Sequence, residues 1–215
     1  MRELISLLPR ARESHHYIRL TRAAKNNLKW WDSGLTIFHG FCPFITDVPL
    51  PSFCLATDAC GVGGGAHFYS DWVYVNWEVD RPSVKEMNIN VQELEVVHQA
   101  ALRWGSLWTA THVLIRSDNA ATVASINKGT SGSPEMLSVL ENLFWLSVQF
   151  NFKLSASFLP GVQNILADRI SRMSDISHAF ELQGLLTNGS FQEVQCKGHM
   201  TYSAYCVCRR SGRQV

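Results

Sequence analysis

The sequence has no long uninterrupted apolar run. Its longest candidate, 139–150, is broken by Glu141, Asn142 and Gln149, and it falls short of the roughly 20 apolar residues that a membrane-spanning helix needs. The apolar stretch 4–8 near the N-terminus is too short for the hydrophobic region of a signal peptide. We therefore expect an intracellular protein that has no transmembrane segment.

Cysteine is also sparse, with six residues among 215. In an intracellular protein we expect these cysteines to be thiols and not a disulfide framework. The tail holds Cys196, His199, Cys206 and Cys208, which are zinc-type ligands, but their spacing fits no zinc-knuckle pattern. The residues from 174 onward therefore favour a poorly defined, loosely ordered tail.

A large net charge is absent too, because the formal charge is +1 at pH 7. Residues 1–31 nevertheless hold seven Arg and Lys against two Glu, whereas residues 32–171 hold seven against thirteen Asp and Glu. The acidic middle argues against simple electrostatic binding of nucleic acid. It is compatible with carboxylates that gather around metal ions, which then contact phosphate. The basic arm either follows phosphates or is a solvated helix face, and its cations are Arg10, Arg12, Arg19, Arg22, Lys25 and Lys29.

The apolar patterns between these regions predict an α/β fold with the element order β-β-β-α-β-α-α-β-α. This order indicates a mixed five-stranded sheet, in which a three-stranded antiparallel meander precedes alternating helices and strands and helices flank the sheet. Glycines at 61 and 63–65 predict a turn after the first strand. The expected strands are 53–58, 66–69, 72–77, 112–117 and 153–159, and the expected helices begin near Thr21, Asn90, Ala120, Ser133 and Asn164.

Four acidic residues lie where these expected elements begin or end. Asp58 ends the first strand, Glu93 lies early in the helix after Asn90, Asp118 follows the fourth strand, and Asp168 lies early in the last helix. Ligand sites in open α/β sheets form at the carboxyl ends of the strands. Four oxygen ligands at one edge suit Mg²⁺ or Mn²⁺ and not zinc. Two ions about 4 Å apart can hold the attacking water and the leaving oxygen of a phosphodiester displacement.

The motifs around these carboxylates resemble a known family. They are "ATDAC" before a Gly-rich turn, "NVQELEVVHQAALRW", "VLIRSDNAATVASINKG" and "FLPGVQNILADRISR". Over roughly 53–172 the chain resembles the ribonuclease H (RNase H) domain of LTR-type retrotransposons, most closely that of DIRS-like elements. The upstream "HHYIRLTRAAKNNLKWWDSGLTIFHG" resembles the segment that joins the reverse-transcriptase thumb to RNase H.

This resemblance implies a function, a set of site residues and three regions. Asp58, Glu93, Asp118 and Asp168 would bind two Mg²⁺ ions, for which Mn²⁺ can substitute, and the RNA strand of an RNA–DNA hybrid would be hydrolysed during reverse transcription. The regions are a thumb-derived arm and connector at 1–50, the RNase H-like domain at 51–173 and the tail at 174–215. No Tyr-x-Asp-Asp-like pair is present, so we expect a reverse-transcriptase domain outside this chain as a partner.

One position departs from the resemblance. Elements of this type often carry a histidine shortly before Pro-Gly, where this chain has Phe158. If such a histidine helps proton transfer or product release, this chain is expected to turn over more slowly. A catalytically silent RNase H-like remnant, which binds nucleic acid or serves as a connection module, is therefore the alternative function. A DEDD exonuclease is disfavoured, because Asp58-Ala59-Cys60 is not the Asp-x-Glu motif of that class.

Several other polar and aromatic residues allow two interpretations. Ser117 and Asn119 either donate to a substrate phosphate or serve a turn, and Asn164 either contacts the substrate or caps a helix. Glu95 is expected to face away from Glu93 and to be solvated. Adjacent Trp30 and Trp31 favour burial at a contact between domains over stacking on a base.

Overall fold

A five-stranded mixed sheet forms the centre of the computed structural model, which describes residues 17, 19–37, 50–175, 177 and 184. The predictions made for Arg10 and Arg12 and for the cysteines and histidine of the tail lie outside the described residues. The strands are β1 (Phe53–Ala59), β2 (Gly63–Phe68), β3 (Asp71–Asn76), β4 (His112–Ser117) and β5 (Lys153–Phe158).

The strand order in this sheet is β3-β2-β1-β4-β5. The meander pairs β1 with β2 and β2 with β3 in antiparallel directions. Strand β4 is parallel to β1, and β5 is parallel to β4. The predicted mixed sheet, a meander followed by strands that alternate with helices, is confirmed. Because β1, β4 and β5 run in one direction, their carboxyl ends lie at the same edge.

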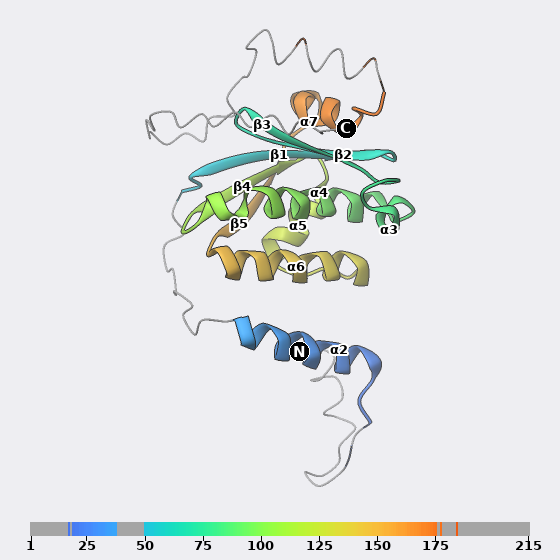
Figure 1. The fold of residues 1–215 in the computed structure, drawn as a ribbon, viewed down its shortest axis with the longest axis vertical. Helices are drawn as coiled ribbons and strands as arrows, with labels where there is room; N and C mark the ends of the chain where they lie inside the picture. The colour runs from blue at the N-terminus through green and yellow to red at the C-terminus, as the bar shows by residue number, and fades with distance from the viewer. Residues whose placement is uncertain (1–16, 18, 38–49, 176, 178–183, 185–215) are drawn as a thin grey trace, which may run out of the picture.

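Helices cover both faces of the sheet (Figure 1). Helix α7 packs on β1 and β2 from one side, whereas α4 and α5 cover the other side and α6 packs behind α4. None of the helices in the described ranges is both long and apolar enough to cross a membrane. The helices and 3₁₀ turns are α2 (Arg22–Ile37), α3 (Pro82–Lys85), α4 (Ile89–Trp104), η2 (Gly105–Trp108), α5 (Ala120–Lys128), α6 (Pro134–Phe150), η3 (Gly161–Gln163) and α7 (Ile165–Ser171).

The helix ends follow local side-chain chemistry. Ser133 accepts a hydrogen bond from the Met136 amide at the start of α6, as its position before Pro134 predicts. Helix α5 ends at Gly129, which adopts a left-handed conformation with φ of 62°. The start of α4 differs from the prediction, because Asn88, and not Asn90, caps this helix.

The glycines at 63–65 do not form the predicted turn but belong to strand β2. A Cβ atom on Gly65 would lie 2.4 Å from the Ser171 amide nitrogen, and one on Gly63 would lie 2.9 Å from the Ser171 carbonyl oxygen. On the other face, a Cβ on Gly64 would lie 2.3 Å from a methyl group of Val96 in α4. The strand therefore needs glycine because helices approach its backbone from both sides, and this close approach brings α7 to β1.

The core lies between the sheet and α4. Trp104 and Trp108 are buried at the end of α4 and in η2, and both of their rings contact Phe68 of β2. Burial of a side chain such as Phe68 contributes roughly 1.5–3 kcal/mol, and the larger tryptophan rings bury more apolar area. This core fixes α4 against β1 and β2 and so determines where the N-terminal part of α4 meets the sheet edge.

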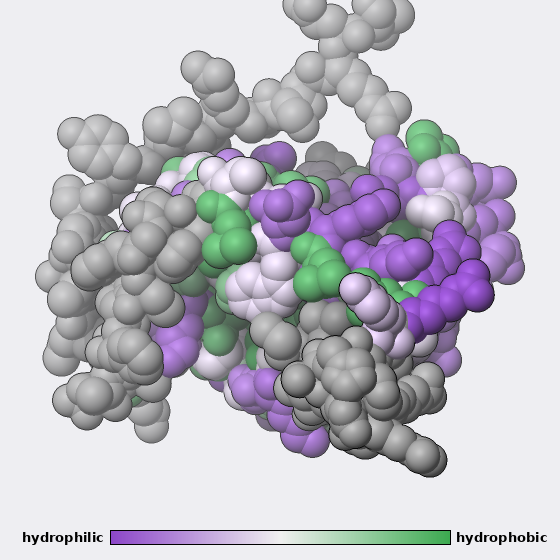
Figure 2. Space-filling view, turned by 90° about the horizontal axis from the view of Figure 1, so that it is seen from below, coloured by the Kyte–Doolittle hydropathy of each residue, from purple (hydrophilic) through white to green (hydrophobic). Residues whose placement is uncertain are grey.

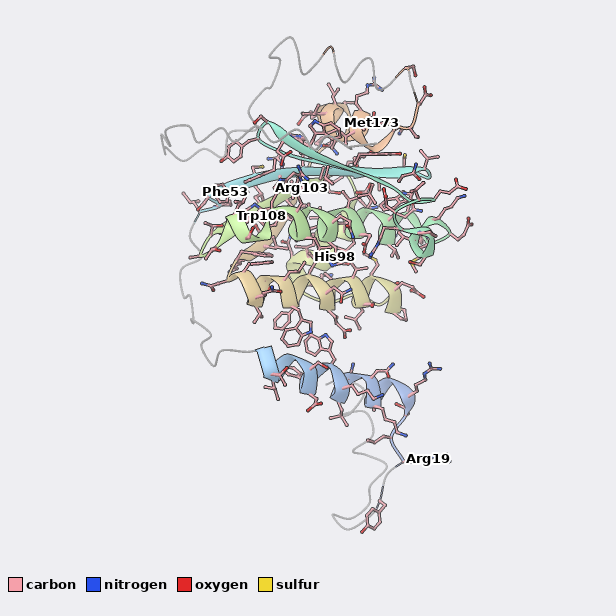
Figure 3. The ribbon with its side chains drawn as sticks, viewed as in Figure 1. Arg19, Phe53, His98, Arg103, Trp108 and Met173 are labelled. Atoms are coloured by element: carbon pink, nitrogen blue, oxygen red, sulfur yellow. The ribbon has the colours of Figure 1, made fainter. Side chains whose placement is uncertain are left out.

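Helix α2 lies apart from the sheet (Figure 1). It contacts α6 through aromatic rings (Figure 3). The rings of Trp30 and Trp145 have centroids 4.6 Å apart, and Gly34 leaves room for Trp145, whose ring a Cβ atom would overlap. Trp30 is partly buried in this contact, whereas Trp31 is 38% exposed, and burial between separate domains stays a prediction. Seen from the side of α2, hydrophobic residues lie beside hydrophilic ones (Figure 2).

Candidate metal-binding active site

Three of the four predicted carboxylates meet at the carboxyl-end edge of the sheet. Asp58 is the penultimate residue of β1, Asp118 directly follows β4, and Glu93 lies in the second turn of α4. Each residue offers an oxygen atom, and these three atoms all lie within 4.8 Å of one another. The parallel pairing of β1 with β4 brings the two aspartates together, and the packing of α4 on the sheet adds the glutamate.

Hydrogen bonds hold two of these carboxylates in place. The Ala59 amide donates to Oε1 of Glu93 at 3.1 Å, and the Ser117 hydroxyl donates to Oε2 at 3.4 Å. The Ser171 hydroxyl donates to Oδ2 of Asp58 at 2.7 Å. The donors come from β1, β4 and α7, so the packing of these elements sets the directions of the oxygen atoms.

Burial and mutual repulsion disfavour the ionised form of the carboxylates in this cluster. Burial raises the pKa of Glu93 to about 8, and repulsion from Asp58 and Asp118 adds to this effect although hydrogen bonds from Ala59 and Ser117 oppose it. Burial also raises the pKa of Asp58 to about 6, against the hydrogen bond from Ser171 and with repulsion from Asp118 and Asp168. Desolvation and like charge are the general causes of such shifts in carboxylates.

These residues fit a divalent cation. Three carboxylates supply hard oxygen donors, the ligands that Mg²⁺, Mn²⁺ and Ca²⁺ prefer. Burial is the main cause of the raised pKa values of Asp58 and Glu93, repulsion between the acids adds to it, and the charge of Arg172 offsets only part of the effect on Asp58. A bound cation would relieve that repulsion, so Asp58, Glu93 and Asp118 form a site that could bind a metal ion.

The fourth predicted carboxylate has other partners. Oδ1 of Asp168 accepts a hydrogen bond from Nε of Arg172 at 2.8 Å, and Oδ2 lies 3.6 Å from a guanidinium nitrogen of Arg169. Within the described part of the chain, Asp168 does not belong to the group of mutually close ligand atoms. It is still near enough to Asp58 to raise the pKa of that group. The structure therefore places Asp168 beside the cluster and turned toward its own helix.

The three residues predicted to bind substrate have structural contacts. Ser117 is buried, donates to Glu93 and accepts from the Asn119 amide at 3.0 Å. Asn119 caps α5 and donates to Oδ1 of Asn90 at 2.8 Å. Asn164 is 2% exposed and donates to the Thr57 carbonyl at 2.8 Å. Their roles in substrate binding stay predictions, and the contacts show that all three residues support the site's framework.

Sequence reasoning missed two contacts on α7 and one on η3. The Ser171 hydroxyl donates to Asp58, and Nε of Arg172, the residue after α7, donates to Asp168. Gly161 lies so close to Asp118 that a Cβ atom on it would be 2.9 Å from Oδ2 of that aspartate. The sequence did contain a signal for the contact between Ser171 and Asp58. Ser171 lies three residues after Asp168 on one helix, so it shares the face that was predicted to approach Asp58.

The prediction that Glu95 is solvated is wrong. Its side chain is 2% exposed and accepts hydrogen bonds from Arg81 and Gln99, and His98 lies within 3.2 Å. Glu95 does face away from Glu93, as expected, but α3 and the residue that precedes it cover that side of α4. These three partners allow the carboxylate to be buried.

The position where related elements often have histidine is the last residue of β5. Phe158 is 53% exposed and pairs in register with Ser117, the residue that donates to Glu93. Its ring therefore lies on the surface at the same end of the sheet as the carboxylates. The predicted effect of Phe158 on turnover stays a prediction.

Comparisons with known proteins identify RNase H domains among the structures similar to this one. No family model and no curated protein matches the sequence. The N-terminal RNase H domain of a Mycobacterium tuberculosis protein, solved as a maltose-binding-protein fusion, has 14% identity and a TM-score of 0.41 over 60% of this chain and 99% of its own. LC11-RNase H1, solved with an RNA/DNA hybrid, has 17% identity and a TM-score of 0.44 over 60% and 99%.

A viral polyprotein is also similar. The prototype foamy virus protease-reverse transcriptase has 12% identity and a TM-score of 0.36, and the match covers 76% of this chain and 22% of the viral chain. Such low identities and TM-scores carry no conclusion about what this chain binds or cuts.

Proposed function

We propose that this chain is a ribonuclease H that hydrolyses the RNA strand of an RNA–DNA hybrid and leaves a 3′-hydroxyl and a 5′-phosphate. Two divalent ions, Mg²⁺ or Mn²⁺, would be held by Asp58, Glu93 and Asp118, with Asp168 as the fourth carboxylate. The observation that carries the proposal is the convergence of three carboxylate oxygens within 4.8 Å of one another, from three separate motifs.

The convergence is more specific than a cluster of surface acids. Asp58 and Glu93 are buried, and both have raised pKa values. Protein interiors rarely hold like charges together without a partner, because their mutual repulsion and the loss of hydration both cost free energy. Strongly perturbed carboxylates of this kind favour a functional role at this edge.

The chain's own residues have distinct tasks in this reaction. Asp58, Glu93 and Asp118 would hold the ions, and Ser117, Ser171 and the Ala59 amide orient the carboxylates. Divalent ions in such a site act as Lewis acids that lower the pKa of water and stabilise the charge on the phosphate. The hybrid would be recognised by its shape and its 2′-hydroxyl groups, so base sequence should matter little.

We further propose that the chain derives from a retrotransposon of the DIRS-like or LTR type. The four sequence motifs support this origin, because each carries one of the four carboxylates. In that setting the partner is a reverse-transcriptase domain outside this chain. The basic helix α2, with exposed Arg22, Lys25 and Lys29, belongs to the segment that would join the two.

The test is cleavage of a hybrid whose RNA and DNA strands carry different labels, in Mg²⁺ or Mn²⁺. Wild type should cut only the RNA strand, and Asp118→Asn should lower the rate at least about a hundredfold, more than loss of an outer-shell partner usually costs. The matched control is Asp32→Asn, an exposed aspartate on α2, which should cut like wild type. Equal rates for wild type and Asp118→Asn would contradict the proposal.

A catalytically silent module is the second candidate. The ion pairs of Asp168 with Arg172 and Arg169 favour it, because they keep this carboxylate away from the other three. A folded wild-type chain that binds the hybrid and leaves both strands intact in either metal would establish this alternative. Cleavage of the RNA strand alone would exclude it.

A further inference from the structure

Arg172 lies at the C-terminal end of α7 and is bonded to the carboxylate that is missing from the metal-binding group. Its Nε donates to Oδ1 of Asp168 at 2.8 Å, across one turn of the helix. Arg169 lies farther away, at 3.6 Å from Oδ2 of the same residue. The contact of Arg172 therefore has hydrogen-bonding geometry, whereas that of Arg169 is an ion pair without a hydrogen bond.

The surroundings of Arg172 leave room for its guanidinium to move. It lines an open cavity of about 490 Å³ together with Cys60, Gly61, Val62 and Ser174, among others. The Arg172 side chain is 47% exposed, and a Cβ on Gly61 would meet nothing within 4 Å. If the hydrogen bond to Asp168 breaks, the guanidinium of Arg172 would thus remain hydrated and need not displace any packed side chain.

Resting on the proposed function, we propose that Arg172 is a positioning residue that competes with a divalent ion for Asp168. While Arg172 holds the carboxylate, Asp168 faces its own helix and the other three acids form an incomplete site. With a divalent ion bound at the cluster, Asp168 would turn toward the other three carboxylates, and the guanidinium of Arg172 would move into the cavity. Arg172 therefore keeps the fourth carboxylate paired before the metal binds and lowers the affinity of the free protein for the ion.

The test measures Mg²⁺ affinity by calorimetry on the full chain, without nucleic acid. Arg172→Gln should bind Mg²⁺ about 3- to 10-fold more tightly than wild type, since it removes the competing donor and its charge. The matched control is Arg169→Gln, which removes the same charge from the same carboxylate at the longer distance of 3.6 Å, and it should change the affinity less than about twofold. Arg172→Lys keeps the charge and should fall between wild type and Arg172→Gln.

A double-mutant cycle tests whether the effect passes through Asp168. In an Asp168→Asn background, the gain in affinity from Arg172→Gln should be much smaller, because Asp168 no longer competes and only the weaker effect of the Arg172 charge on Asp58 remains. Unfolding in EDTA checks that each variant is folded, and Arg172→Lys serves if the glutamine variant is not.

The possible failures can be told apart. Unchanged or weaker Mg²⁺ binding by Arg172→Gln would overturn the competition, as would equal gains in Arg172→Gln and Arg169→Gln, which would indicate a general charge effect. Either result leaves the proposed function intact, because wild type still binds the ion. A wild-type chain that binds no Mg²⁺ or Mn²⁺ would overturn both proposals.

Discussion

Helix α4 carries two buried glutamates, two residues apart, whose surroundings have opposite effects on their charge. Glu93 faces Asp58 and Asp118 at the sheet edge, and its pKa is raised to about 8 by burial and by these negative neighbours. Burial also acts to raise the pKa of Glu95, but hydrogen bonds and charges from His98, Gln99 and Arg81 outweigh it and hold the pKa below its usual value.

The difference in pKa between the two glutamates indicates that Glu95 is a structural carboxylate and that Glu93 needs a ligand. Glu95 has its counter-charges within the fold, so its burial holds Arg81 against α4. Glu93 has hydrogen bonds but only like charges beside it, and a cation from solution is what would balance them. Burial alone therefore does not indicate function, whereas burial among like charges does.

The largest expected effect comes from removing the charge of Glu93. Glu93→Gln should lower cleavage of the hybrid at least about a hundredfold and should abolish the rise in melting temperature that Mg²⁺ produces. Without metal, the variant should be at least as stable as wild type near and above pH 8, where Glu93 of the wild type is ionised and repels Asp58 and Asp118. Melting curves in EDTA and in Mg²⁺ check this, and a Mg²⁺-dependent shift equal to that of wild type would contradict it.

The same substitution two residues later should have the opposite result. Glu95→Gln leaves Arg81 and His98 without their carboxylate partner, and removal of one member of a buried ion pair costs about 3 kcal/mol of unfolding free energy. We use the lower end of the usual range because the Arg81 side chain is 38% exposed. Urea unfolding measures the loss, and Mg²⁺ affinity should stay that of the wild type; an affinity loss as large as that of Glu93→Gln would remove the distinction between the two glutamates.

A smaller effect is expected from pH. The folded protein binds a proton at Glu93 up to about pH 8, whereas a glutamate in the unfolded chain releases it near the ordinary pKa of 4.5. The folded state therefore holds more protons, and the metal-free chain should lose stability, on the order of 1–2 kcal/mol, as the pH rises from about 6.5 to about 8. Lower pH is avoided because burial lowers the pKa of His67 to about 4, which has the opposite effect on stability.

Mg²⁺ should reverse this pH dependence, since the ion binds the deprotonated carboxylates of the folded state. Urea unfolding at the two pH values, in EDTA and in Mg²⁺, provides the measurement. Glu93→Gln is the control and should show a flat profile in EDTA. A wild-type chain whose metal-free stability rises over this range would show that Glu93 is already ionised and paired.

Much of the fold follows from local patterns in the sequence. The alternation of apolar residues and the cap at Ser133 predicted the strands and α6, and the order of these elements predicted the mixed sheet. Because carboxyl ends of parallel strands share an edge, the meeting of Asp58 with Asp118 was predictable too. These features depend on periodicity and connectivity, which a sequence contains.

The tertiary structure alone determined how closely the helices approach β2 and which side chains pair with Glu95 and Asp168. The glycines of β2 looked like a turn, and their need for space became visible only with α7 and α4 packed against them. Glu95 looked solvated because its partner Arg81 lies 14 residues earlier, on a segment whose position against α4 the sequence pattern does not specify. Asp168 lies near enough to Asp58 to affect its pKa, but its carboxylate bonds to Arg172, and the sequence pattern does not specify this pairing. Side-chain pairing depends on distances between packed elements, and those distances exist only in the folded chain.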